Sequence, residues 1–319
     1  MRARLSTTSC RGRSSSLRRS TLTALGVASL LFGGNIPLSQ AAPSQAAPTV
    51  PAQLLQVTST AYWSSAGPDP TGLTFMRSRG RLLVSDAEVD EIPRLWKRNN
   101  LFVASRHGAL LRRGSVRAAS TEPEDIAWRD QSHSLFVVDD DLDQVYRIRA
   151  GKDNLIGTAD DRRNRVLRTR SFGSMDPEGL AWRERGRSLI LTDSRSARVF
   201  IVRAGRDHRF GTRDDRVRRF STKPLGLTHP EDVEFDPRSN HLLLVSSAQE
   251  FVAETTLSGR LLRMIDISDA HVRRAAGITL APSPSDPSVM DLYIVAKGVD
   301  NESDPLENDG ELFRFAFPS

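Results

Sequence analysis

Glu178-Gly-Leu-Ala-Trp182 and, after a short polar turn, Leu189-Ile-Leu-Thr-Asp193 form a two-part pattern that recurs along the chain. A shift of 54 residues gives Glu124-Asp-Ile-Ala-Trp128, followed at the same distance by Leu135-Phe-Val-Val-Asp139. A fixed period of this length, which aligns several landmarks at once, is the sequence signature of a repeat architecture.

Three weaker copies of the pattern flank this pair. Their apolar runs are short, rich in Val, Ile and Leu, and bounded by Gly, Asp, Asn and Ser, which is typical of strands. Four short strands per copy of about 53 residues predict the blades of an all-β propeller. The first segments of the weaker copies are Gly72-Leu-Thr-Phe75, Glu231-Asp-Val-Glu-Phe235 and Gly277-Ile-Thr-Leu280.

The two ends of the propeller, predicted over residues 53–319, are expected to share one blade. Gln53-Leu-Leu-Gln-Val-Thr58 and Glu311-Leu-Phe-Arg-Phe-Ala-Phe317 both have strand patterns and can close the ring together. Five four-stranded blades are predicted, and six remain an alternative because residues 92–120 have room for an additional hairpin.

The first 42 residues have the three parts of an export signal. A basic segment precedes an apolar run of about 14 residues, and small residues follow at Ser39-Gln-Ala41 and again at Ser44-Gln-Ala46, either of which a signal peptidase could recognise. Because this run is shorter than the roughly 20 residues that span a bilayer as a helix, a cleaved signal peptide is favoured over an uncleaved anchor. Residues 43–52 are rich in Pro and Ala and are interpreted as a linker. We therefore expect a secreted, periplasmic or cell-surface protein without an integral membrane segment.

Charge and cysteine content exclude several classes of function. The chain has 45 basic and 39 acidic residues, but six arginines lie in the leader, so the remainder is balanced at 39 against 39. This balance gives no indication of nucleic-acid binding. Cys10, in the leader, is the only cysteine, so the mature chain offers neither disulfides nor cysteine–zinc sites. We expect a monomer.

The repeat resembles that of NHL and gluconolactonase-like (senescence marker protein) propellers. The resemblance rests on Pro177-Glu-Gly-Leu-Ala-Trp182, then Leu189-Ile-Leu-Thr-Asp193 and Val199 after a polar turn. The Pro-Glu-Gly variant is also similar to esterase-like phytase and SdiA-regulated propellers. These families imply a propeller fold and, in several members, a metal site at the central channel.

Three glutamates form the first candidate site. Glu124, Glu178 and Glu231 each follow a proline and precede the first strand of a blade, so they should converge at one end of the channel. Three adjacent carboxylates need a shared cation or proton, and an all-oxygen cage suits Ca²⁺. His229 would lie at the rim as a base or ligand. The alternative is that these glutamates only accept backbone N–H bonds in turns.

Two acidic loops form the second candidate site for calcium. The loops Ala150–Asp161 and Ala204–Asp215 match at seven of twelve positions, and the candidate ligands are carboxylates. Hairpin turns built from Asp, Asn and Gly are the alternative. The candidate ligands are Asp153, Asp160, Asp161, Asp207, Asp214 and Asp215.

Asp193 ends the second apolar run of its copy and is followed by Ser194. In lactonase-type relatives an aspartate in this context ligates the catalytic metal, so Glu178, Asp193 and His229 are the catalytic candidates that the resemblance and the spacing indicate. Those relatives also carry asparagines where this chain has glutamates or Thr71, which argues against a lactonase. A turn-capping role for Asp193 is the alternative.

No Gly-x-Ser-x-Gly, Walker A or His-Glu-x-x-His motif occurs in the sequence. The sequence therefore indicates an exported calcium-binding propeller that binds a protein, a glycan or a small molecule at one face. A metal-dependent hydrolase of a lactone, ester or phosphoester remains the alternative.

Overall fold

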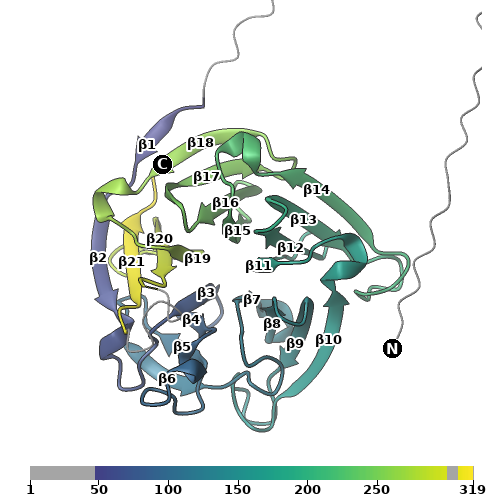
Figure 1. The fold of residues 1–319 in the computed structure, drawn as a ribbon, viewed down its shortest axis with the longest axis horizontal. Coiled ribbons are helices and arrows are strands. Elements are labelled where there is room, and N and C mark those ends of the chain that lie inside the picture. Colours follow the sequence, from purple (N-terminus) through teal and green to yellow (C-terminus); the bar gives the residue numbers. More distant parts are fainter. Residues whose placement is uncertain (1–46, 300–307, 319) are drawn as a thin grey trace, which may run out of the picture. The chain divides into compact units, whose positions relative to one another are not determined.

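Each copy of the repeat folds into one antiparallel sheet, and five such sheets surround a central axis (Figure 1). The computed structural model describes residues 47–299 and 308–318. The predicted signal peptide, residues 1–42, and residues 43–46 of the predicted linker lie outside the described residues. Among the described residues, no helix is of sufficient length and apolarity to cross a membrane.

The first strand of every blade lies nearest the axis (Figure 1). Blade one contains β3 (Pro70–Met76), β4 (Arg81–Asp86), β5 (Leu101–Ala104) and β6 (Leu110–Gly114). Blade two contains β7 (Asp125–Arg129), β8 (Ser134–Asp139), β9 (Gln144–Arg149) and β10 (Arg162–Arg168). Blade three contains β11 (Pro177–Arg183), β12 (Ser188–Asp193), β13 (Arg198–Arg203) and β14 (Arg216–Ser221). Blade four contains β15 (Pro230–Asp236), β16 (His241–Ser246), β17 (Gln249–Thr256) and β18 (Leu261–Asp266). Blade five contains β19 (Ala275–Pro282), β20 (Met290–Ala296), β21 (Glu311–Ala316) and β2 (Leu54–Ser59).

Helical structure in the described residues is limited to 3₁₀ turns between strands. They are η1 (Thr60–Tyr62), η2 (Val89–Glu91), η3 (Asp130–Ser132), η4 (Thr169–Phe172), η5 (Lys223–Leu225) and η6 (Ser268–Ala270).

The blade number settles the alternative that the sequence left open. Residues 92–120 hold β5 and β6, which are the outer strands of blade one and not an additional hairpin. The propeller therefore has five blades, and the 54-residue shift relates each strand of blade two to its counterpart in blade three. The predicted all-β propeller is confirmed.

The ring closes as the sequence predicted, with one addition. β2 pairs antiparallel with β21, so the two ends of the propeller share blade five. Thr49–Pro51, at the end of the stretch interpreted as a linker, forms a further strand, β1, which pairs parallel with β18 on blade four. The segment 49–59 thus adds strands to two neighbouring blades.

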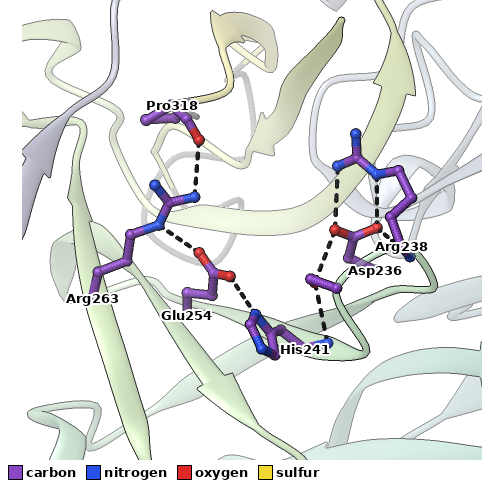
Figure 2. Close-up of polar contacts among 7 residues, drawn as sticks. Asp236, Arg238, His241, Glu254, Arg263 and Pro318 are labelled. Atoms are coloured by element: carbon purple, nitrogen blue, oxygen red, sulfur yellow. Dashed lines mark hydrogen bonds and ion pairs between the residues drawn. The ribbon is translucent and has the colours of Figure 1, made fainter.

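A group of charged side chains reinforces this closure (Figure 2). Glu254 on β17 accepts hydrogen bonds from Arg263 Nε at 2.5 Å and shares a 2.6 Å contact with His241 Nδ1. Arg263 also donates to the carbonyl of Pro318 at 2.9 Å, which ties the end of blade five to blade four. Removal of one partner from such a group would leave the other charges without compensation, which is strongly destabilising.

Five apolar clusters form the core, one at each interface between neighbouring blades. Between blades two and three, Phe136 stacks on Trp182 with ring centroids 5.2 Å apart, and Leu180 and Leu191 pack beside them. Trp128 has the equivalent place between blades one and two. Because a blade is buried on both faces, its inner strands are continuous apolar runs and not alternating ones.

Two buried aspartates at the axis connect all five inner strands. Asp125 of blade two accepts N–H bonds from Leu73 of blade one at 3.1 Å and Leu180 of blade three at 2.5 Å. Asp232 of blade four accepts one from Ile278 of blade five at 2.7 Å. The strands carry register shifts at these points, which turn the N–H groups away from their own sheets and toward the axis.

These two carboxyl groups share a proton. Burial raises the pKa of Asp125 well above its usual range, and the adjacent Asp232 carboxyl raises it further. Burial also raises the pKa of Asp232, to about 6, against the hydrogen bonds that it accepts. Two neighbouring buried carboxylates cannot both ionise, so one remains protonated at neutral pH.

The remaining three blades have glycine at the position that Asp125 and Asp232 occupy. An added Cβ on Gly72 would lie 2.6 Å from Asp125 Cα, and one on Gly277 would lie 2.7 Å from the Thr71 carbonyl. On Gly179 it would overlap the backbone of Asp232. The order Gly, Asp, Gly, Asp, Gly around the ring therefore lets each aspartate reach across to its neighbours.

We predict that Gly179→Ala lowers the free energy of unfolding by about 1–3 kcal/mol or more, because the methyl group has no free volume against the Asp232 backbone. Chemical denaturation followed by tryptophan fluorescence measures this. Gly67→Ala is the matched control, since its nearest neighbour would be Asp86 Oδ2 at 3.4 Å, an ordinary contact. Equal stability of Gly179→Ala and the parent protein would contradict the role assigned to the axis.

Candidate functional site

The three predicted glutamates lie together at one end of the channel. Glu124 immediately precedes β7, and Glu178 and Glu231 are the second residues of β11 and β15. Each offers a carboxylate oxygen within 4.8 Å of the others. They converge because equivalent positions of the repeat lie at the same height around the axis, with β7, β11 and β15 adjacent at the centre of the ring (Figure 1).

A lysine that the sequence analysis missed lies among them. Lys297, directly after β20 of blade five, places its Nζ 2.8 Å from Glu124 Oε1, and both side chains are almost fully buried. Burial alone would lower the pKa of Lys297, but Glu124, Glu231 and Glu178 outweigh it and hold this pKa well above its usual range. The ammonium therefore remains charged and is a resident cation of the cluster.

One ammonium does not compensate three carboxylates. Burial raises the pKa of Glu178 well above its usual range, and the charges of Glu124 and Glu231 raise it further. Burial likewise raises the pKa of Glu231, although Lys297 and a 2.5 Å hydrogen bond donated by Ser247 oppose the rise. The cluster thus has an excess of negative charge.

Further carboxyl groups surround this end of the channel. Burial, together with the charge of Glu124, raises the pKa of Asp140 to about 7. Asp69 is fully buried, and burial together with Glu88 raises its pKa to about 10. The acidic end of the channel, defined by these groups and the three glutamates, is therefore a region in which an additional cation would be stabilised.

The repeat contained a signal for Lys297 that the sequence analysis did not use. The position directly after the second strand is equivalent in all five blades, and in three of them its residue interacts with a glutamate of the cluster. The residues at this position in blades one to five are Ala87, Asp140, Ser194, Ser247 and Lys297. Asp125 and Asp232 had a similar signal, since each directly follows a glutamate that was singled out.

Chemically, the glutamates suit a hard cation. An ion that is equidistant from three atoms at most 4.8 Å apart can lie within about 2.8 Å of each, so a small contraction would reach the 2.3–2.6 Å of calcium–oxygen bonds. The space between the side chains is small, however, and it contains no cavity large enough for a substrate. Within residues 47–299 and 308–318, this is the only group of three metal-capable side chains.

The other two catalytic candidates, both described, make no hydrogen bond to Glu178. Asp193 accepts hydrogen bonds from Ser196 N at 2.8 Å and from Ser174 Oγ and Met175 N at 2.8 Å each. These contacts are those of the turn-capping alternative. His229 is exposed and contacts Thr228 Oγ1 through Nδ1 at 3.1 Å. No hydrogen bond joins any two of the three candidates, all of which are described.

The two acidic loops direct their carboxylates toward their own backbones. Asp160 accepts N–H bonds from Lys152 at 2.6 Å and a hydroxyl bond from Thr158 at 2.9 Å. Asp161 accepts a hydrogen bond from Gly157 N–H at 2.7 Å, and Asp153 accepts one from Leu155 N–H at 2.8 Å. The second loop repeats these contacts at Asp207, Asp214 and Asp215. These are the contacts of the hairpin-turn alternative, in which each carboxylate satisfies backbone donors.

An open pocket lies at the opposite end of the channel. It has a volume of about 760 Å³, and its walls include a ring of large apolar residues from successive inner strands. Glu234 and Thr279 line its floor, and burial raises the pKa of Glu234 to about 8. The ring consists of Phe75, Trp128, Trp182, Phe235 and Leu280.

Comparison with known proteins identifies the family. A model of the family described as SdiA-regulated matches residues 71–294, which is more than half of the chain, so the chain belongs to this family. A comparison of the sequence with curated proteins found no match.

Solved structures share the propeller fold. An aldose sugar dehydrogenase from Streptomyces coelicolor, solved in its PQQ-bound form, is similar with a TM-score of 0.49 and 14% identity, over 83% of this chain and 97% of that one. Regucalcin from Agrobacterium tumefaciens, a calcium-binding protein, has a TM-score of 0.46 and 12% identity over 86% and 98%. A gluconolactonase from Xanthomonas campestris has a TM-score of 0.44 and 15% identity over 77% and 72%. At these values the likeness concerns only the fold.

We predict that Glu178→Gln stabilises the metal-free protein at pH 8 but not at pH 4. The folded-state pKa of Glu178 is raised, so its contribution to stability is fully present below the unfolded pKa of about 4.5 and is lost as the pH rises. Glutamine removes that loss, and the melting temperature at pH 8 in EDTA should rise by about 2 °C or more. Glu250→Gln, at an exposed site, is the control. A variant less stable than the parent at pH 8 would show that Glu178 is not under charge strain.

We predict that Lys297→Met destabilises the protein by about 3–5 kcal/mol at pH 7, because three buried carboxyls lose their resident cation. The deficit should shrink as the pH falls and these carboxyls protonate. Urea denaturation at pH 7 and pH 4 measures both effects, with Lys152→Met as the exposed control. An equal deficit at both pH values would mean that lost packing, and not charge, accounts for it.

Proposed function

We propose that this member of the SdiA-regulated family is an exported β-propeller that binds Ca²⁺ at its glutamate cluster and acts as a binding module. The convergence of Glu124, Glu178 and Glu231 around a single ammonium carries the calcium part of this proposal. Three ionised glutamates and Lys297 leave a formal charge of −2, which one divalent cation would neutralise. Without that cation, protons compensate instead, and the raised pKa values of Glu178 and Glu231 reflect this.

A binding role is favoured over hydrolysis because the open pocket of the channel lies at the end opposite the glutamate cluster. The glutamate cluster lacks a cavity for a substrate, and Lys297 already occupies part of the space between its carboxylates. Catalysis by a nucleophile and base also requires side chains within hydrogen-bond reach, and Glu178, Asp193 and His229 are not joined in this way.

The hydrolase alternative is supported by one observation, the convergence of three oxygen ligands at a propeller channel. A metal held there would polarise a carbonyl or phosphoryl oxygen of a lactone, ester or phosphoester. To reach the metal, the carbonyl or phosphoryl group would have to pass the side chains of Lys297, Ser247 and Asp140.

The open pocket at the opposite end of the channel is our proposed ligand site. Its ring of aromatic edges offers apolar contact, and the exposed side chains of Arg77, Arg185 and Arg238 supply hydrogen-bond donors at its mouth. A glycan or a segment of another protein requires this combination of apolar walls with a polar rim. Export through the predicted signal peptide would expose the calcium site to the calcium levels at which extracellular modules work.

We predict that Ca²⁺ raises the melting temperature of the protein more at pH 8 than at pH 5. Calcium must displace protons from Glu178 and Glu231, so its affinity rises with pH. At about 100 times the dissociation constant the expected rise is roughly 5 °C. Differential scanning fluorimetry at both pH values, with Mg²⁺ in parallel, measures this.

Two variants locate the ion. Glu178→Gln should abolish the calcium response, whereas the loop variant Asp160→Asn/Asp161→Asn, which removes two carboxylate charges from a surface turn, should retain it. Loss of the response only in the loop variant would place a structural ion in the loop and contradict the channel site. A lactone, carboxylester or phosphoester that is hydrolysed only with calcium, and not by Glu178→Gln, would replace the binding proposal by the hydrolase.

A further inference from the structure

A strongly basic pocket lies between blades two and three, away from the glutamate cluster. It has a volume of about 430 Å³ and includes residues of β9, β10 and the loop before β14. No acidic residue is among those that line it. Six of the lining residues are arginines, namely Arg129, Arg147, Arg149, Arg165, Arg187 and Arg209.

Most of this positive charge has no partner among the described residues. Arg129 pairs with Glu184 at 3.1 Å, and Arg147 donates to the hydroxyl oxygens of two serines. The other four guanidinium groups make no hydrogen bond or ion pair within the described residues. Burial, together with the like charges of Arg149, Arg129 and Arg187, lowers the pKa of Arg147 to about 10.

The equivalent pocket between blades one and two provides a contrast. It has a volume of about 390 Å³ and also contains arginines, but these bind the adjacent loop. Arg112 donates to the carbonyl of Ile156 at 2.5 Å, and Arg79 to the side-chain oxygen of Asn154 at 3.3 Å. In the pocket between blades one and two, Arg79 and Arg112 therefore hold the adjacent loop. In the pocket between blades two and three, four arginines remain available for a ligand.

The hairpin before β12 places a further arginine at the pocket. Arg187 adopts a left-handed conformation, with φ of 49°, at the hairpin position that Gly80 and Asn240 occupy in blades one and four. Glycine and asparagine favour this conformation, and arginine does not. In blade two the same position is His133, with φ of 42°, so this turn also takes large side chains.

An aromatic wall completes the pocket. Phe136 and Trp182 stack with centroids 5.2 Å apart, and Phe210 lies edge-on to Trp182 at 6.1 Å. Arg129 lies over the Trp182 ring, 4.7 Å from its centroid. Phe136 is buried and Trp182 is packed against Phe136 and Arg129, so the partly exposed Phe210 is the aromatic side chain that offers apolar contact beside the guanidinium groups.

We propose that this pocket binds a small sugar-sized molecule that carries phosphate or sulfate esters. Guanidinium groups bind tetrahedral oxyanions through paired, charge-assisted hydrogen bonds, and several of them can share one polyanion. The apolar face of a sugar ring packs against aromatic side chains, and the pocket volume is within the range of small-molecule sites. The pocket shares Trp182 and Arg187 with the channel pocket but none of the calcium ligands, so the inference stands apart from the proposed calcium site.

Isothermal titration calorimetry of the full protein at 150 mM salt tests this, with glucose 6-phosphate, glucose 6-sulfate and glucose as probes. Both esters, or one of them, should bind, and glucose should bind far more weakly. Arg149→Gln/Arg165→Gln should weaken ester binding by about tenfold or more, because two charged donors are lost. Both side chains are exposed, so the fold should persist, and circular dichroism verifies this.

Arg163→Gln/Arg218→Gln removes the same charge from β10 and β14 outside the pocket and should change affinity by no more than about twofold at this salt concentration. The tighter ester identifies whether phosphate or sulfate is preferred. Three results would overturn the proposal: no binding of either ester, unchanged binding by the pocket variant, or equal loss in both variants. The last would indicate a general surface charge, as would tight binding of a single-stranded oligonucleotide that the pocket variant retains.

Discussion

The hydrogen bonds of Asp125 and Asp232 at the axis are the constraint on which the rest of the structure depends. A five-bladed ring brings its inner strands close, and the irregular start of each strand turns N–H groups toward the axis, where water cannot satisfy them. Two carboxyl groups that share a proton accept those donors from three neighbouring blades. The remaining blades must then carry glycine, because a Cβ would meet an aspartate at Gly72 and Gly179 and the backbone of blade one at Gly277.

This closed centre divides the channel into two chemically different ends. On one side, Glu124, Glu178 and Glu231 are held within reach of one cation, and the protein supplies Lys297 as a partial counter-charge. On the other side, the inner strands widen into an open pocket with aromatic walls. Since no continuous passage through the axis is needed, each end can take a separate role, with ion binding at one and ligand binding at the other.

Excess charge of opposite sign marks two of the regions that we regard as functional, the glutamate cluster and the pocket between blades two and three. The acidic end raises the pKa of its own glutamates, and the pocket between blades two and three lowers the pKa of Arg147. Elsewhere the protein pairs its buried charges. At Glu254, for example, Arg263 and His241 lie within hydrogen-bond distance of the carboxylate (Figure 2). Unpaired charge that persists in a packed structure is typical of sites that an external ligand completes.

The sequence by itself determined the all-β propeller, the closing blade shared by residues 53–58 and 311–317, and the convergence of three glutamates. All of these follow from a repeat, because equivalent positions of a cyclic repeat must lie at equal height around one axis. Only the tertiary structure decided that β5 and β6 complete blade one, that Lys297 lies among the glutamates, and that arginines from two blades share a pocket. Those contacts join residues from different copies of the repeat, which are often far apart in the sequence. The repeat pattern describes each copy separately and does not predict which side chains of different blades meet when the ring closes.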